Sequence, residues 1–142
     1  MALRTIRIQG DPVLTKKCRE ITEMTPKIKE LIDDMLDTMY EANGVGLAGP
    51  QVGVLKRIVV IDIGEGPVVM INPVITKKTG AFQTEEGCLS LDGVRPCTRY
   101  KEIEVDYLDT NFKKQHGKYI GWTAQIIQHE VDHARDPHAS GR

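Results

Sequence analysis

The sequence lacks the features that mark membrane proteins, secreted proteins and nucleic-acid-binding proteins. No apolar run approaches the ~20 residues that a membrane-spanning helix needs. The first residues, MALRTIRIQGDPV, lack the long apolar core of a secretory signal. Basic and acidic residues nearly balance, and a net charge of −1 gives no electrostatic attraction for a polyanion. We therefore expect no membrane segment and no nucleic-acid partner.

Cysteine is also scarce. The three cysteines, Cys18, Cys88 and Cys97, form neither a C-x-x-C pair nor an even-numbered disulfide framework. Reduced thiols are typical of the cytosol, so we expect a cytoplasmic protein whose cysteines are either inert or functional. The 142 residues suffice to bury one core and are too few for two, which predicts a single domain over residues 1–142.

One helix is predicted in the first third of the chain. Thr25 is suited to cap it, Pro26 to occupy its first turn and Gly44 to end it. Between these residues, apolar side chains recur at three- and four-residue spacing, which predicts one buried face. The residues of this face are Ile28, Leu31, Ile32, Met35, Leu36 and Met39.

The middle of the chain predicts strands, and its end predicts a second helix. Two β-branched runs, 57–63 and 67–75, flank the turn-forming sequence Gly64-Glu65-Gly66. Alternation in 101–109 predicts a strand with Ile103, Val105 and Tyr107 on one face. Helical spacing returns from Trp122 to about Ala134. This order predicts an α+β fold with an antiparallel sheet flanked by helices.

The predicted last helix contains His129-Glu130-Val131-Asp132-His133, an H-E-x-x-H motif. Residues four apart on a helix lie one above the other, so His129 and His133 can present two nitrogens to one ion. Glu130 lies beside His129, close enough to contact a water on that ion without ligating it. The alternative is that two histidines face a core by chance. With only four histidines in the chain, this spacing around a glutamate favours the metal site.

A catalytic ion of this kind needs three protein ligands and an open position. His138 is the downstream candidate for the third ligand, but Asp136-Pro137 should end the helix before it. Cys88, in a predicted turn within TEEGCLSL, is the upstream candidate, and a thiolate beside two imidazoles suits Zn²⁺ or Fe²⁺. A single cysteine is more often a small buried residue than a ligand. The residues alone therefore leave the third ligand open.

Three motifs, taken together, resemble those of the peptide deformylase family. They are G-x-G-L-A-x-x-Q at 44–51, E-G-C-L-S at 86–90 and H-E-x-D-H at 129–133, in the family's order and approximate spacing. The resemblance covers nearly the whole chain. It implies antiparallel sheets packed around a C-terminal metal-binding helix, with a further N-terminal helix. It also implies a hydrolase that removes the N-formyl group from the initiator methionine of nascent polypeptides and releases formate.

The resemblance assigns roles to individual residues. The metal ligands would be Cys88, His129 and His133, and the ion is expected to be Fe²⁺, while Zn²⁺, Ni²⁺ or Co²⁺ would suit the same ligands. Supporting positions around the site fall on Glu86, Arg95 and Asp132. The catalytic residues would be Glu130, Gln51 and Leu89, the last through its backbone N–H, and the substrate-binding residues would be Val45, Gly46, Gly87, Trp122 and Ile126.

The resemblance also implies a reaction and partners. Glu130 would accept a proton from the attacking water and deliver it to the leaving amine. Gln51 and the N–H of Leu89 would hold the developing oxyanion. N-formylmethionyl nascent peptides would add a strand beside Val45 and Gly46. The ribosome near its exit tunnel is the expected partner, in the cytoplasm of a bacterial, phage-encoded or organellar translation system.

The chain departs from the family pattern in three places. Gly49 stands where the family usually has alanine, which predicts extra room beneath the site. Leu91-Asp92-Gly93 replaces a turn that usually contains proline. Residues 135–142 carry no large apolar side chain, which predicts a frayed or non-native tail. Two other functions stay open: a metallo-amidase for another N-acylated substrate, and a non-catalytic relative that binds peptides or ribosomes.

Overall fold

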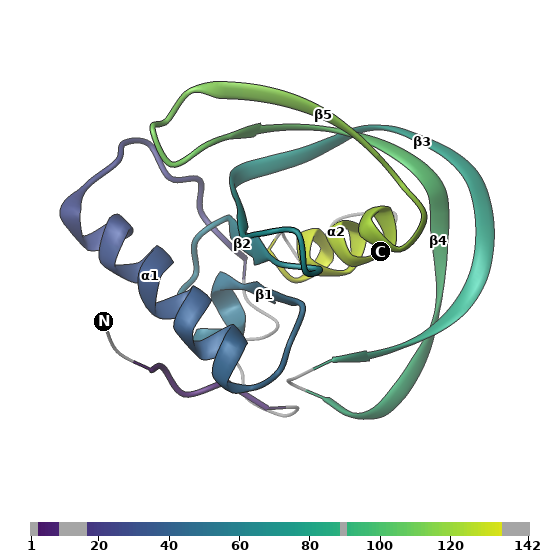
Figure 1. Cartoon of the computed structure of the whole chain (residues 1–142), viewed down its shortest axis with the longest axis horizontal. Helices are drawn as coiled ribbons and strands as arrows, with labels where there is room; N and C mark the ends of the chain where they lie inside the picture. The colour runs from purple at the N-terminus through teal and green to yellow at the C-terminus, as the bar shows by residue number, and fades with distance from the viewer. Residues whose placement is uncertain (1–2, 9–16, 89–90, 135–142) are drawn as a thin grey trace.

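A computed structural model describes residues 3–8, 17–88 and 91–134 (Figure 1). The strands form one five-stranded antiparallel sheet in the order β1-β2-β3-β4-β5, which confirms the predicted α+β fold. No helix in the described part of the chain is long and apolar enough to cross a membrane. The elements are α1 (Pro26–Glu41), β1 (Gly46–Ala48), the 3-10 helix η2 (Gly49–Val52), β2 (Ile58–Ile61), β3 (Val68–Cys88), β4 (Leu91–Leu108), β5 (Lys114–Ile120) and α2 (Gly121–His133).

Helix α1 begins at the predicted residues. The residue that ends it lies one position before the predicted one. The hydroxyl of Thr25 accepts a hydrogen bond from the N–H of Ile28 at 3.2 Å, and Pro26 is the first helical residue. At the other end, the left-handed residue is Asn43, with φ 56°, rather than the predicted Gly44. Asparagine tolerates this conformation because its short polar side chain can hydrogen-bond locally. The resulting turn leads directly into β1.

Strand β2 is buried on both faces, and this places a helix on each side of the sheet. Alternate side chains of a strand point to opposite faces. Val59 and Ile61 accordingly pack with α2, whereas Ile58 and Val60 pack with α1. Figure 1 shows α2 lying within the curve of β3 and β4, with α1 beyond β1 and β2. The two helices contribute Leu31, Ile32, Met35 and Met39 from α1, and Ala124, Ile126, Ile127 and Val131 from α2.

The ribbon formed by β3 and β4 is longer than the sequence predicts. Strand β3 spans 21 residues and β4 returns over 18, whereas the sequence predicts strands only at 67–75 and 101–109. Register shifts near Val74 and Lys77 interrupt the pairing, and irregularities of this kind bend a ribbon. Cys88, predicted in a turn, is the last residue of β3 and pairs with Leu91. The ribbon thereby brings the end of β3 to α2.

Candidate active site

Helix α2 presents two histidines on one side, as the H-E-x-x-H motif predicts. The ring centroids of His129 and His133 lie 5.0 Å apart, with an angle of 71° between the ring planes. Both residues are partly buried. Two imidazoles at this separation on one helix are a usual pair of ligands for a divalent metal.

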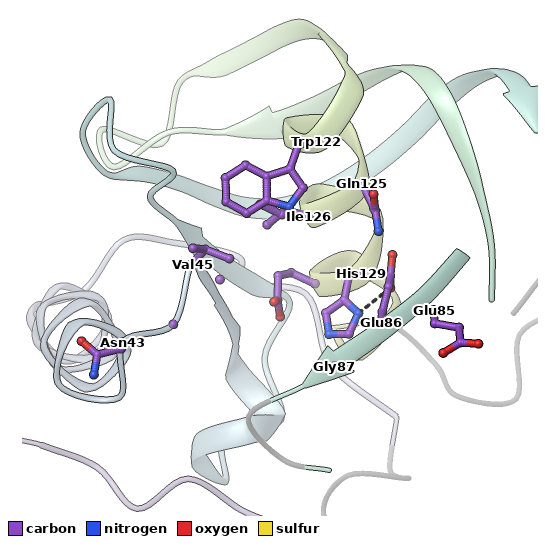
Figure 2. Close-up of a pocket in the computed structure, with 12 residues that line it drawn as sticks. Asn43, Val45, Glu85, Glu86, Gly87, Trp122, Gln125, Ile126 and His129 are labelled. Atoms are coloured by element: carbon purple, nitrogen blue, oxygen red, sulfur yellow. Dashed lines mark hydrogen bonds and ion pairs between the residues drawn. The ribbon is translucent and has the colours of Figure 1, made fainter. Parts of the chain in front are cut away.

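The orientation of His129 is set from the neighbouring strand. Glu86, two residues before Cys88 in β3, lies 2.8 Å from Nδ1 of His129 through its Oε1 (Figure 2). An ionised carboxylate can only accept, so Nδ1 donates this hydrogen bond. Metal-binding histidines commonly donate one ring nitrogen to a carboxylate in this way, which directs the other nitrogen, here Nε2, toward the metal. His129 and His133 therefore fit two of the ligand positions that a divalent ion needs.

A buried arginine holds Glu86 in place. Arg99 in β4 donates from Nε and Nη2 to the two oxygens of Glu86, at 2.9 and 2.7 Å, and from Nη1 to Asp132 at 2.7 Å. Burial alone would raise the pKa of Glu86, but the hydrogen bonds from His129 and Arg99 hold it well below its usual range. Burial alone would lower the pKa of Arg99, and its two carboxylate partners raise it instead. Glu86 therefore stays ionised and able to orient His129.

The sequence pattern predicts no role for Arg99. It lies in phase with Ile103 and Val105, which form the buried face of β4. A charged residue at a buried position of a strand requires a charged partner. This pattern could have predicted a role for Arg99. The supporting roles expected of Glu86 and Asp132 agree with this network. The side chain of Arg95, the third expected supporting residue, lies outside the described part of the chain.

We expect Arg99→Met to destabilise the fold by about 3–5 kcal/mol, because it leaves the Glu86 carboxylate buried without its main partner. It should also lower the affinity for a divalent ion by ~10- to 100-fold, because His129 loses its fixed orientation. Urea denaturation and metal titration measure the two effects. The control is Lys101→Met, at an exposed position of β4, which should change neither. Unchanged metal affinity in Arg99→Met would show that Glu86 orients His129 unaided.

A cavity of about 490 Å³ opens beside His129 and Glu86. The start of β1, the end of β3 and one face of α2 form its walls, and Figure 2 shows their side chains arranged around it. The cavity brings together seven residues that the sequence predicts for the site: Val45, Gly46, Gly87, Trp122, Ile126, His129 and Glu130.

Glu130 lies against the backbone of β1. Its side chain is buried, with 5% of the residue exposed. A Cβ atom built on Gly46 would lie 2.6 Å from Oε2 of Glu130, which is closer than any real side chain allows. Glycine at position 46 therefore lets the carboxylate occupy its place beside His129.

Gln51 is buried in η2 and does not line the cavity. Its Oε1 accepts a hydrogen bond from the N–H of Ala48 at 2.9 Å, which ties η2 to the end of β1. Because the oxygen is engaged in this bond, the amide nitrogen is the end that can donate to a substrate oxygen. A role as a donor to the oxyanion stays a prediction.

Gly49 does not leave the extra room that the sequence predicts. A Cβ atom at this position would lie 2.7 Å from the carbonyl oxygen of Lys56 and 2.8 Å from that of Val54. The expectation was wrong because the backbone that follows η2 fills the space. Gly49 is thus a point of close backbone packing.

The third metal ligand stays a prediction. The side chain of Cys88 lies outside the described part of the chain, as do Leu89, His138 and the predicted tail at 135–142. Among the described residues, no group of three histidine, cysteine, aspartate or glutamate side chains could hold a metal ion. Strand β3 nevertheless carries the backbone of Cys88 two residues beyond Glu86, which contacts His129.

Comparison with known sequences gives consistent matches. The sequence profile of the polypeptide deformylase family matches residues 3–136. The chain is 57% identical over 134 residues to the peptide deformylase of Agathobacter rectalis, covering 94% of this chain and 85% of the relative. It is 48% identical over 136 residues to peptide deformylase 1 of Clostridium perfringens, covering 94% of this chain and 92% of the relative.

Solved structures agree with these matches. The peptide deformylase of Thermotoga maritima superposes with a TM-score of 0.89 at 40% identity, covering 93% of this chain and 91% of the other. That of Synechococcus elongatus, solved in complex with actinonin, gives 0.86 at 40% identity, covering 91% and 72%. Because the profile and the relatives span nearly the whole chain at high identity, the chain belongs to the polypeptide deformylase family.

Proposed function

We propose that the chain is a metal-dependent hydrolase that removes the N-formyl group from the initiator methionine of nascent polypeptides and releases formate. One observation carries the proposal. His129 and Glu130 of α2 meet the backbone of β1 at a single cavity, in a chain whose relatives are named peptide deformylases. Hydrolysis of a formamide needs an activated water, a proton acceptor and a place for the peptide, and this arrangement can supply all three.

A divalent metal ion is expected of a member of this family, and His129, His133 and Cys88 would hold it. When bound, such an ion acts as a Lewis acid and makes water nucleophilic near neutral pH. We propose Fe²⁺ as the ion, because a thiolate beside two imidazoles suits it, and Zn²⁺, Ni²⁺ or Co²⁺ would suit the same ligands.

Glu130 is the residue best placed to move the proton. Its carboxylate is buried between the backbone of Gly46 and helix α2, next to His129 in the cavity wall. In this position it would accept a proton from the attacking water and deliver it to the leaving amine nitrogen. The close contact with Gly46 restricts the carboxylate, so little reorientation would be needed between the two transfers.

The developing charge on the formyl oxygen would be held by two N–H donors. One is the side-chain amide of Gln51, whose orientation is preset because its Oε1 accepts from Ala48. The other is the backbone N–H of Leu89. One donor of this kind stabilises a transition state by about 3 kcal/mol in comparable sites.

The peptide would bind in an extended form beside β1. Strand β1 is the last strand on its side of the sheet and, within the described residues, pairs only with β2. A substrate backbone beside Val45 and Gly46 would extend the sheet by one strand, a mode that reads few side chains. Trp122, Ile126 and Gly87 would enclose the first side chain.

The proposed substrates place the enzyme where proteins are made. N-formylmethionyl peptides arise in bacterial, phage-encoded or organellar translation, so we propose a cytoplasmic enzyme that acts near the ribosomal exit tunnel. Relatives from the bacteria Agathobacter rectalis and Clostridium perfringens support this setting.

The preferred acyl group tests the proposal. A formyl carbon carries only hydrogen, so a site that closes around it would exclude the methyl group of acetyl by overpacking. We expect kcat/KM for formate release from formyl-Met-Ala-Ser to exceed that for acetate release from acetyl-Met-Ala-Ser by at least ~100-fold, near the upper end of what one methyl group is worth.

Each other outcome of this assay favours a different function. Comparable rates on the two peptides would favour a metallo-amidase that acts on another N-acylated substrate. A metal-loaded protein that hydrolyses neither peptide would favour the non-catalytic, peptide-binding relative.

A further inference from the structure

The cavity wall that would face the first side chain is not uniformly apolar. Val45, Trp122 and Ile126 supply its apolar part. Gln125 also lines it, from a position on α2 four residues before His129 and therefore on the same face of the helix. A methionine thioether is only a weak hydrogen-bond acceptor, so it offers this amide little.

Glu86 orients the Gln125 amide. The Gln125 amide is directed at the Glu86 carboxylate, and Figure 2 shows the two side chains pointing toward one another. Glu86 is itself held at both oxygens by Arg99, at 2.7 and 2.9 Å, so the amide has a rigid partner. A glutamine amide has two N–H donors and one oxygen acceptor, and one donor faces Glu86 here.

The other donor and the oxygen of Gln125 make no hydrogen bond to another residue within the described part of the chain. While the cavity is open, water can bond to them. Once an apolar side chain fills the cavity, they are covered without replacement, which is unfavourable. A first side chain with its own hydrogen-bond acceptor at the depth of the sulfur would restore the lost bond.

We propose that Gln125 makes this a pocket for polar as well as apolar first side chains, so that the enzyme hydrolyses N-formyl peptides that begin with methionine sulfoxide as well as methionine. This inference rests on the proposed function and adds the residue that sets side-chain specificity. Methionine sulfoxide keeps the chain length of methionine and adds one oxygen on sulfur, a polar acceptor. Trp122, which is 56% exposed, forms a wall of the cavity next to solvent.

The kinetic test compares formyl-Met-Ala-Ser with the same peptide oxidised at its methionine. For the unmodified enzyme we expect the two kcat/KM values for formate release to lie within roughly tenfold of each other, as one satisfied hydrogen bond allows. Gln125→Met keeps the length of the side chain and removes its donors. It should raise the preference for the unoxidised peptide by a further factor of roughly ten or more, because the sulfoxide then lies against an apolar wall.

A matched control removes a glutamine that is not at the site. Gln83→Met makes the same substitution at an exposed position of β3, where the side chain donates a hydrogen bond to Thr98, and should leave the preference unchanged. Rejection of the sulfoxide peptide by more than roughly 100-fold in the unmodified enzyme would overturn the inference, because it exceeds the cost of one unmet hydrogen bond. An unchanged preference in Gln125→Met would overturn it as well.

A binding measurement separates this inference from the proposed function. Trp122 is the only tryptophan of the chain and lines the cavity, so its fluorescence reports occupancy. The probes are the deformylated peptide Met-Ala-Ser and its sulfoxide. The unmodified enzyme should bind both with Kd values within roughly tenfold, and Gln125→Met should separate them by roughly tenfold or more.

The kinetic and binding measurements together distinguish a failure of the proposed function from a failure of the role of Gln125. If both peptides bind to the unmodified enzyme but neither formyl peptide is hydrolysed, the proposed function fails and the polar pocket stands. If the formyl-methionine peptide is hydrolysed but the sulfoxide peptide is neither bound nor hydrolysed, the function stands and the role of Gln125 is wrong.

Discussion

Glu130→Gln should leave the divalent ion bound while lowering kcat for formate release by about 10²- to 10⁴-fold. Glutamine has nearly the shape of glutamate, so it can lie against Gly46, where the space is too tight for one additional Cβ atom. The variant retains His129 and His133, but a glutamine side chain cannot accept a proton at neutral pH. Metal analysis and steady-state kinetics on the same preparation measure the two quantities. Near-normal turnover would remove the proton-transfer role of Glu130.

A companion variant tests whether the position of this carboxylate matters as much as its chemistry. Gly46→Ala would push the carboxylate away, because the new Cβ would meet Oε2 of Glu130 at 2.6 Å. We expect kcat to fall with the metal retained. The double variant with Glu130→Gln should be no slower than the slower single variant, because both changes act on one group. If the reductions in kcat of the two single variants multiplied in the double variant, Gly46 would act independently of Glu130.

Cys88→Ala should lose stoichiometric metal and, with it, essentially all formate release. Two imidazoles from α2 are one ligand short of a catalytic site, and a thiolate from the end of β3 would complete it. Ligation that joins a strand to a helix also contributes to folding, so the melting temperature should fall toward that of the metal-free protein. Atomic absorption and thermal unfolding provide the readings.

Two controls accompany this substitution. His138→Ala removes the competing candidate and should behave as the unmodified enzyme does. Cys18→Ala removes a fully buried thiol of the chain and should keep the metal at full stoichiometry. Metal retained in full by Cys88→Ala, or lost in His138→Ala, would contradict the assignment of the third ligand.

The elements that could be predicted from the sequence are those specified by neighbouring residues. Helix α1 has a cap, a first-turn proline and a regular apolar stripe, and all three signals lie within its own segment. The second half of β3 has no comparable local signal, because its residues 76–87 are largely polar and mostly exposed. Pairing across the ribbon, rather than burial, holds this part of it, and pairing partners are not apparent from one strand.

The same distinction applies to the site. His129, Glu130 and His133 could be predicted because one helix turn brings them together. Arg99 and Gln125 were missed because their roles depend on Glu86, which reaches them through the folding of the long ribbon; Glu86 and His129 are 43 residues apart in the chain. Gly49 was misjudged for a related reason, since the carbonyl groups that fill its space belong to a later loop.

The central claim is that a bound divalent ion, together with Glu130, hydrolyses the formyl amide, and a metal titration tests it most directly. Metal-free protein is titrated anaerobically with Fe²⁺ while formate release from formyl-Met-Ala-Ser is followed. We predict that the rate rises in proportion to the added ion and levels off at one equivalent per chain. A metal-free protein that releases formate at the full rate, or a fully loaded protein that releases none, would contradict the claim.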